Sequence, residues 1–106
     1  MAERKPEKGN ARRVVQAPRV GRMKRRLVPA VQKAVDDVVT AIIANPLLGE
    51  PKKGALKGVR VEKFKAVNQQ WLLAFQYDQK RDVIELLDVG THENFYRDLE
   101  TYLGDR

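Results

Sequence analysis

The 106-residue sequence contains no cysteine and no serine, and it has a single histidine, His92. Without cysteine, neither a disulfide framework nor a thiolate metal site can form. Without serine, a serine-based hydroxyl triad is excluded, and one histidine cannot supply the histidine pair of a common metal motif. We therefore expect no metal and no other cofactor, so any catalysis would be acid–base work supported by cationic side chains.

Long hydrophobic runs are also missing. No apolar stretch approaches the roughly 18 residues of a membrane span, and the N-terminus lacks the apolar region of a secretion signal. Hydrophobic residues make up 42% and charged residues 33% of the chain, a mix typical of soluble globular proteins. We expect a cytoplasmic protein with no membrane partner. Residues 1–11 are predicted to be a disordered basic lead-in, and residues 12–106 a single domain.

The net charge of +7 is distributed unevenly. Residues 1–26 hold ten Lys and Arg against two Glu, and residues 52–65 hold six bases against one acid. Residues 78–106, in contrast, hold four bases and eight acids. Two basic segments of this kind suit phosphate groups, and they predict binding that weakens as salt is added. The alternative is that the charge serves solubility alone.

Hydrophobic spacing predicts the element order β-α-α-β-β-β-α. Val31, Val35 and Ile42 recur at helical steps, so residues 28–45 are expected to form the best-defined helix. Short gaps between the later strands imply antiparallel neighbours, and hence an α+β domain with helices packed on one antiparallel sheet. The other expected elements are a strand within 12–19, helical turns at 20–27, a loop at 45–58, strands at 59–65, 71–78 and 82–89, and a last helix from His92 to Leu103.

His92 and Tyr96 are the first candidate site residues. We expect Gly90 to end the strand and Thr91 to cap the last helix, which would place both rings one turn apart on one helix face. A histidine at a helix N-terminus is well placed to meet a bound phosphate, where it could act as general acid or base. The alternative is a half-buried histidine that packs or caps the helix.

A group of cationic side chains is the second candidate. Lys63 and Lys65 alternate by two, so on a strand they project from one face and could stabilise the charge that develops on a phosphodiester. The alternative is a solvated strand face. Trp71, Phe75 and Tyr77 could stack bases, but in so apolar a strand they are expected to be core. Further phosphate-binding candidates near the lysines in sequence are Lys52, Lys53, Lys57 and Arg60.

Three stretches together carry a family resemblance: NPLLGEPKKGALKGVRVEKFK (45–65), WLLAFQYD (71–78) and LLDVGTHENFYRDLETYL (86–103). They contain an Asn-Pro-x-x-Gly loop after a long helix, a basic first meander strand and a Gly-x-His turn before the last helix. From about Val14 to Leu103 the chain resembles toxins of the RelE/ParE superfamily from type II toxin–antitoxin modules. The first eleven residues lie outside the resemblance.

The resemblance implies a RelE-like microbial RNase fold and an endoribonuclease that cuts mRNA, usually on the translating ribosome, and arrests growth until a cognate antitoxin silences it. In such enzymes the ribose 2′-OH attacks the adjacent phosphate and a cyclic phosphate forms. Lys63 and Lys65 match the catalytic lysines of RelE-type members. His92 matches a histidine that some members use for acid–base work, and Tyr96 matches an assisting aromatic position.

Two positions depart from the family pattern. RelE-type ribonucleases have an arginine at the start of the second meander strand, where this chain has Leu72, and another near the start of the last helix, where this chain has the Thr91-His92 step. Cationic support would then come from Lys63, Lys65, Arg60 or Arg97. The superfamily also contains members that poison DNA gyrase and generally lack the catalytic set, so a non-enzymatic gyrase poison stays the alternative. A plain RNA- or ribosome-binding module is a third reading.

Overall fold

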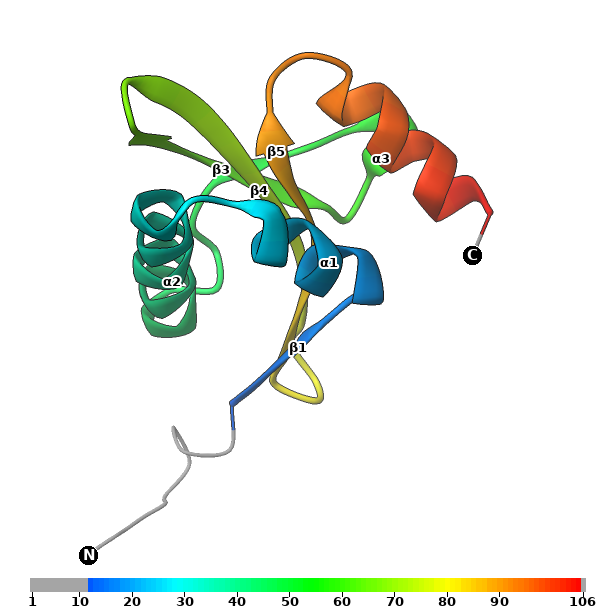
Figure 1. Cartoon of the computed structure of the whole chain (residues 1–106). Helices are drawn as coiled ribbons and strands as arrows, with labels where there is room; N and C mark the ends of the chain where they lie inside the picture. The colour runs from blue at the N-terminus through cyan, green and yellow to red at the C-terminus, as the bar shows by residue number, and fades with distance from the viewer. Residues whose placement is uncertain (1–11, 106) are drawn as a thin grey trace, which may run out of the picture.

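The computed structural model describes residues 12–105, which form one five-stranded sheet with strand order β1-β5-β4-β3-β2 and helices on both faces (Figure 1). The predicted order β-α-α-β-β-β-α is confirmed, with a short strand and a 3₁₀ helix added inside the segment predicted to be a loop. The elements are β1 (Arg13–Gln16), α1 (Pro18–Arg26), α2 (Pro29–Ala44), β2 (Glu50–Pro51), η3 (Gly54–Leu56), β3 (Arg60–Ala66), β4 (Gln69–Asp78), β5 (Val83–Thr91) and α3 (Phe95–Gly104).

The helix α2 covers one face of the sheet. It begins at Pro29, whose missing N–H is not needed in the first turn, and it ends before Pro46. Its predicted stripe of Val31, Val35 and Ile42 is buried and belongs to a cluster that also holds side chains of β4 and β5. The helix α1 adds Val20 to the same cluster.

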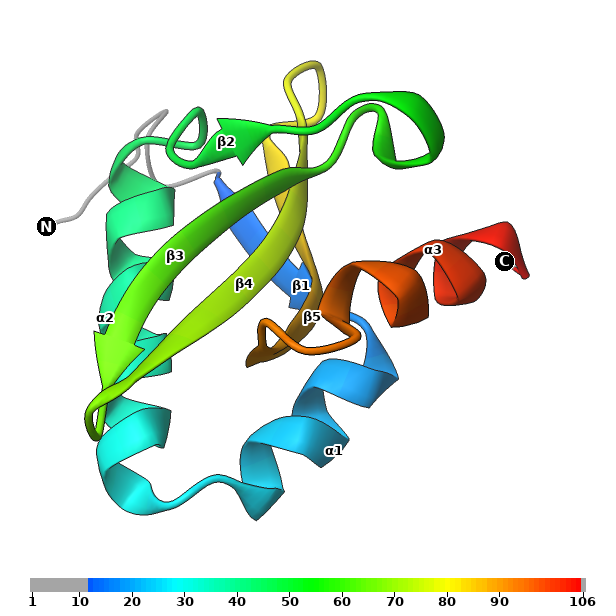
Figure 2. The same cartoon turned by 90° about the horizontal axis from the view of Figure 1, so that it is seen from above.

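The helix α3 covers the opposite face of the sheet. In Figure 2, α2 lies behind the sheet and α3 lies in front of it. Phe95 and Leu99 point inward from α3 and pack with Leu72 and Leu87 in a second buried cluster. The strand β4 therefore has apolar neighbours on both faces, which is why its sequence WLLAF is almost continuously hydrophobic. Phe75 is fully buried, and Trp71 and Tyr77 pack against the first cluster, as expected for core residues.

The three later strands are antiparallel neighbours, as predicted, but the sheet as a whole is mixed. β1 lies at the edge and pairs with β5 in parallel, Arg13 opposite Val83. The intervening α1, α2 and meander give the chain enough length to return in the same direction, which a short hairpin could not do. The α+β class with helices on one sheet is confirmed.

The boundary between β5 and α3 differs from the prediction. Gly90 and Thr91 belong to β5, where Gly90 pairs with Leu72, so Gly90 does not end the strand and Thr91 does not cap the helix. α3 begins at Phe95, after Asn94 at a positive φ of 62°. Pairing with Leu72 and Trp71 of β4 keeps Gly90 and Thr91 extended, although glycine weakens a strand by itself. The strand β5 is therefore two residues longer at its end than the local sequence indicates.

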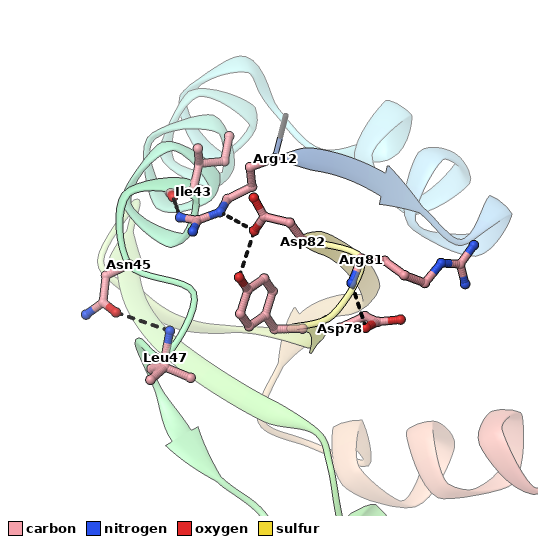
Figure 3. A network of polar contacts seen from close by, with 8 residues as sticks. Arg12, Ile43, Asn45, Leu47, Asp78, Arg81 and Asp82 are labelled. Atoms are coloured by element: carbon pink, nitrogen blue, oxygen red, sulfur yellow. Dashed lines mark hydrogen bonds and ion pairs between the residues drawn. The ribbon is translucent and has the colours of Figure 1, made fainter. Parts of the chain in front are cut away.

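A polar network closes the end of the molecule that lies away from α3 (Figure 3). Arg12 donates to the Asp82 carboxylate at 2.8 Å and to the Ile43 carbonyl at 2.6 Å, and the Tyr77 hydroxyl donates to Asp82 at 2.7 Å. The network joins the start of β1 to the β4–β5 turn and to the C-terminal end of α2. It supplies a partner to a helix carbonyl that has none within the helix.

The Asn-Pro-x-x-Gly loop is held by specific contacts. The Asn45 side-chain oxygen accepts the backbone N–H of Leu47 at 3.2 Å (Figure 3). The Arg60 guanidinium donates to the carbonyls of Leu47, Leu48 and Gly49 at 2.5, 3.0 and 3.2 Å. Gly49 has a φ of +85°, and a Cβ there would lie 2.8 Å from the Val61 carbonyl oxygen.

We expect Gly49→Ala to lower the free energy of unfolding by about 2–4 kcal/mol, because the new methyl group meets backbone that cannot move aside and the φ is strained for alanine. Urea unfolding of the parent and the variant measures the difference. Gly104→Ala is the control, since a Cβ at that helix position meets nothing within 4 Å. Equal stability of the two variants would contradict the close approach of Gly49 to Val61.

The predicted lead-in at residues 1–11 lies outside the described residues. Within residues 12–105, no helix is long and apolar enough to cross a membrane.

Candidate functional site

Lys63 and Lys65 project from the α3 side of the sheet. Side chains alternate along β3, and Val61, two residues before Lys63, is buried in the cluster beneath α3. Both lysines are exposed and pair in register with Leu72 and Gln70 of β4. Both side chains therefore lie on the same face of the sheet as α3 and are exposed to solvent.

His92 lies in the turn between β5 and α3, not in the helix. Its side chain is exposed, its carbonyl accepts the Phe95 N–H at 3.2 Å, and its ring lies edge-on to Tyr96 with the ring centroids 5.6 Å apart. The prediction that His92 opens the last helix is wrong, because α3 starts three residues later, at Phe95. The expected closeness of the two rings is confirmed.

The strand register brings this turn and the lysines to one end of the sheet. Lys63 pairs with Leu72, and Leu72 pairs with Gly90, so the three residues form one row across β3, β4 and β5. Adjacent strands lie about 4.8 Å apart, which places the backbone of Lys63 about 10 Å from that of Gly90. His92 follows two residues after Gly90. The register therefore places His92 and both lysines at the same end of the sheet, and we use the name α3-edge surface for Lys63, Lys65, His92 and Tyr96.

Lys52 approaches this surface from the segment between β2 and η3. Its ammonium lies 4.8 Å from the centroid of the Tyr96 ring and 3.0 Å from the Glu50 carboxylate. The hydrogen bond that Lys52 donates to Glu50 raises the pKa of Lys52, so this lysine stays cationic. A cation on the ring of Tyr96 fixes the position of that ring, which in turn contacts His92.

Glu50 is a site residue that the sequence patterns did not indicate. The hydrogen bond from Lys52 is the main cause of a lowered pKa of Glu50, and the charge of Lys63 lowers it further. The carboxylate therefore stays ionised, supported by Lys52 from the segment after β2 and by Lys63 of β3. A two-residue strand gives no alternation, so only its pairing with Val61 of β3 places Glu50 here.

The structure does not bring all of the predicted cations together. Arg60 lies on the other face of β3 from Lys63, and its donors are used by three carbonyls of the Asn-Pro-x-x-Gly loop. Lys53, Lys57 and Arg97 are exposed, and the Arg97 guanidinium lies 3.8 Å from the Asp98 carboxylate. Of the predicted phosphate-binding residues, Lys52 has the closest contact with a predicted catalytic side chain.

Leu72 lies on β4 between Lys63 of β3 and Gly90 of β5. It is fully buried and packs with Val61, Leu87 and Phe95. Its position therefore contributes to the core under α3 and offers no charge to a phosphate. Within residues 12–105, no group of three or more histidine and carboxylate side chains is arranged to hold a metal ion. The groups on offer are an imidazole, amines, a phenol and one ionised carboxylate.

The fold is that of a bacterial toxin. The chain superposes on an arginine-to-alanine double variant of the Escherichia coli toxin RelE in the free state with a TM-score of 0.71 and 16% identity, over 89% of this chain and 97% of that one. It matches the RelBE2 toxin–antitoxin complex of Mycobacterium tuberculosis with a TM-score of 0.68 and 19% identity (77% and 99% covered). The intact E. coli RelBE complex gives 0.64 and 18% (78% and 99% covered).

The family follows from the sequence itself. Residues 14–100 match the family model of the ParE-like toxin of type II bacterial toxin–antitoxin systems. The chain belongs to this family, and it is a toxin of the RelE/ParE superfamily, as its resemblance indicates. No curated protein sequence matches it significantly.

Proposed function

We propose that this toxin is a metal-free endoribonuclease that cuts mRNA in the cytoplasm, in association with the ribosome, and thereby arrests translation and growth. The observation that supports the proposal is the exposed His92 imidazole, which stands against Tyr96 at the same end of the sheet as Lys63 and Lys65. Acid–base cleavage of a phosphodiester uses side chains that can transfer protons and stabilise charge. The exposed imidazole and the two exposed amines can do both.

In the proposed reaction, the ribose 2′-oxygen attacks the adjacent phosphorus and a new O2′–P bond forms. The bond between phosphorus and the 5′-oxygen breaks, leaving a 2′,3′-cyclic phosphate. His92 in its protonated form gives its proton to the departing 5′-oxygen. Lys63 or Lys65 accepts the 2′-OH proton as a neutral amine, or as an ammonium it stabilises the negative charge on the phosphorane oxygens while water takes that proton. Tyr96, held by Lys52, orients the imidazole or stacks on a base.

A cognate antitoxin is the proposed protein partner. Two of the structures that share this fold, E. coli RelBE and M. tuberculosis RelBE2, are toxin–antitoxin complexes, and an archaeal RelE–RelB complex from Pyrococcus horikoshii matches with a TM-score of 0.57 and 13% identity (78% and 97% covered). An antitoxin encoded beside this toxin would silence it by binding.

The second candidate is a non-enzymatic toxin that poisons DNA gyrase. Two observations favour it: the matching family model is ParE-like, and the position where RelE-type ribonucleases have an arginine carries the buried Leu72. A gyrase poison acts through a binding surface, so it needs neither His92 nor the lysine pair.

Inducing the toxin alone in a bacterial host separates the two functions. A ribonuclease is expected to arrest growth with rapid loss of intact transcripts and new 5′ ends inside coding sequences, while DNA stays undamaged. A gyrase poison is expected to induce the DNA-damage response and alter plasmid supercoiling with transcripts intact. Growth without arrest, and with both nucleic acids intact, would contradict both functions and leave a plain RNA- or ribosome-binding module.

A further inference from the structure

One proton transfer in the proposed reaction has no defined acceptor. The ribose 2′-OH loses its proton as its oxygen attacks phosphorus, so a group without that proton must stand ready near pH 7. A lysine amine in water is protonated at this pH and then has no electron pair with which to accept another proton. Lys63 and Lys65 therefore suit the stabilisation of the phosphorane, and a carboxylate suits the role of the base.

Glu50 is a carboxylate that the sheet places on the side of these lysines. Glu50 pairs with Val61 across β2 and β3, and residues opposite each other in an antiparallel pair share one face of the sheet. Val61 is buried beneath α3, so the Glu50 side chain lies on the α3 side. Lys63 follows two residues after Val61 on the same face. The hydrogen bond from Lys52 and the charge of Lys63 lower the pKa of Glu50, which keeps it ionised near pH 7.

Glu50 is connected to His92 through Lys52 and Tyr96. The Lys52 ammonium donates to Oε1 of Glu50 at 3.0 Å and lies 4.8 Å from the centroid of the Tyr96 ring. The His92 ring meets the same Tyr96 ring edge-on, with the centroids 5.6 Å apart. One chain of contacts thus links an ionised carboxylate to the imidazole, and it draws on three parts of the fold that are distant in sequence.

The Glu50 carboxylate has an oxygen available to a substrate. Lys52 occupies Oε1, and no other hydrogen bond to this carboxylate forms within residues 12–105. The Glu50 side chain is 62% exposed, whereas that of Lys52 is 21% exposed. A ribose hydroxyl can therefore reach Oε2 without displacing the lysine that holds the carboxylate in place.

We propose that Glu50 is the general base of the cleavage. The inference rests on the proposed function and names the group that takes the proton. Oε2 of Glu50 accepts the 2′-OH proton as the O2′–P bond forms, and His92 gives its proton to the 5′-oxygen as the P–O5′ bond breaks. Lys63 and Lys65 act as ammonium groups that stabilise the phosphorane. Glu50 then releases its proton to water, and His92 regains one from water.

The test is single-turnover cleavage of a model mRNA on programmed ribosomes by the full-length toxin, between about pH 6 and pH 8. E50Q is expected to lower the rate by about 10²-fold, since a general base is lost. The rate of the parent should fall as the pH rises, because His92 loses the proton that it must donate. The rate of E50Q should not fall, because hydroxide replaces the carboxylate and its concentration rises with pH.

K52M separates a base from a residue that only positions Lys52. This variant removes the ammonium from the Tyr96 ring and leaves the Glu50 carboxylate in place, so it should lose about tenfold in rate at most and keep the falling pH profile. The matched control is E62Q. Glu62 lies on the other face of β3 from Lys63, where it pairs with Leu73 of the cluster beneath α2, and E62Q should keep the parent's rate and pH profile.

Three results would each overturn the assignment of Glu50: an E50Q rate equal to that of the parent, an E62Q rate as low as that of E50Q, or a slow E50Q that keeps the falling pH profile. K52M as slow as E50Q would overturn it in favour of a positioning role. The proposed function is judged separately. A parent that leaves RNA intact refutes the cleavage and the base together, whereas cleavage that requires His92 and is unchanged in E50Q refutes the base alone.

Discussion

Replacing His92 by alanine is expected to abolish growth arrest and to slow transcript cleavage by about 10²–10⁴-fold, the usual contribution of a general acid. The alanine removes the strongest acid from the α3-edge surface, because ammonium and phenol groups give up a proton to the departing 5′-oxygen less readily than an imidazolium does. Growth curves after induction and mapping of transcript ends measure the two effects.

The fold should survive this change. The His92 side chain is exposed, and its ring contacts the Tyr96 ring edge-on. Such a contact contributes about 0.5–1.5 kcal/mol to the free energy of unfolding. Thermal unfolding and antitoxin binding should therefore stay close to those of the parent. Glu93→Gln in the same turn is the control, since it alters an adjacent exposed residue and should remain toxic. Full toxicity of His92→Ala, with the protein folded, would remove His92 from the mechanism and favour the gyrase-poisoning function.

The double variant K63A/K65A is expected to lower the cleavage rate by about 10²-fold or more, as is typical when a donor to a developing oxyanion is lost. Leu72 leaves the neighbouring position on β4 without charge, so no arginine at that place can compensate. Both lysines are exposed, and their removal should cost the fold little. Single-turnover cleavage of a model mRNA on programmed ribosomes measures the rate apart from binding.

The matched control for the lysine pair is K33A/K80A, which removes the same charge from α2 and from the β4–β5 turn. If K33A/K80A loses as much activity as K63A/K65A, the effect is one of overall charge and the two lysines have no specific role. If K63A/K65A keeps the parent's rate, the proposed support of the phosphorane by β3 is wrong.

Features that depend on neighbours in sequence were predictable. The stripe of Val31, Val35 and Ile42 defined α2, Pro29 and Pro46 marked its ends, and the apolar WLLAF indicated a strand buried on both faces. The resemblance added the family, which the match over residues 14–100 confirms. Each of these signals is local, because helix periodicity and proline geometry act within a few residues.

Features that depend on pairing between distant segments were not predictable in the same way. Gly90 and Thr91 read as a strand end and a helix cap, yet β4 holds both in β5 and moves the start of α3 to Phe95. Glu50 reached the site only because β2 pairs with Val61 of β3. Arg60 and Lys63 belong to one basic stretch, but alternation along β3 sends them to opposite faces, and only Lys63 reaches the side of α3.

The sequence by itself determined the chemistry that is available to this toxin: one imidazole, no thiol, no serine hydroxyl, two basic segments and a strand too apolar to be a binding surface. Only the tertiary structure decided which of these groups meet. It set His92 in an exposed turn against Tyr96, and it brought Lys52, with its partner Glu50, to the other side of the Tyr96 contact. Composition and local periodicity are properties of short segments, whereas these meetings depend on strand register and on which face each side chain occupies, and both are fixed only when the whole sheet forms.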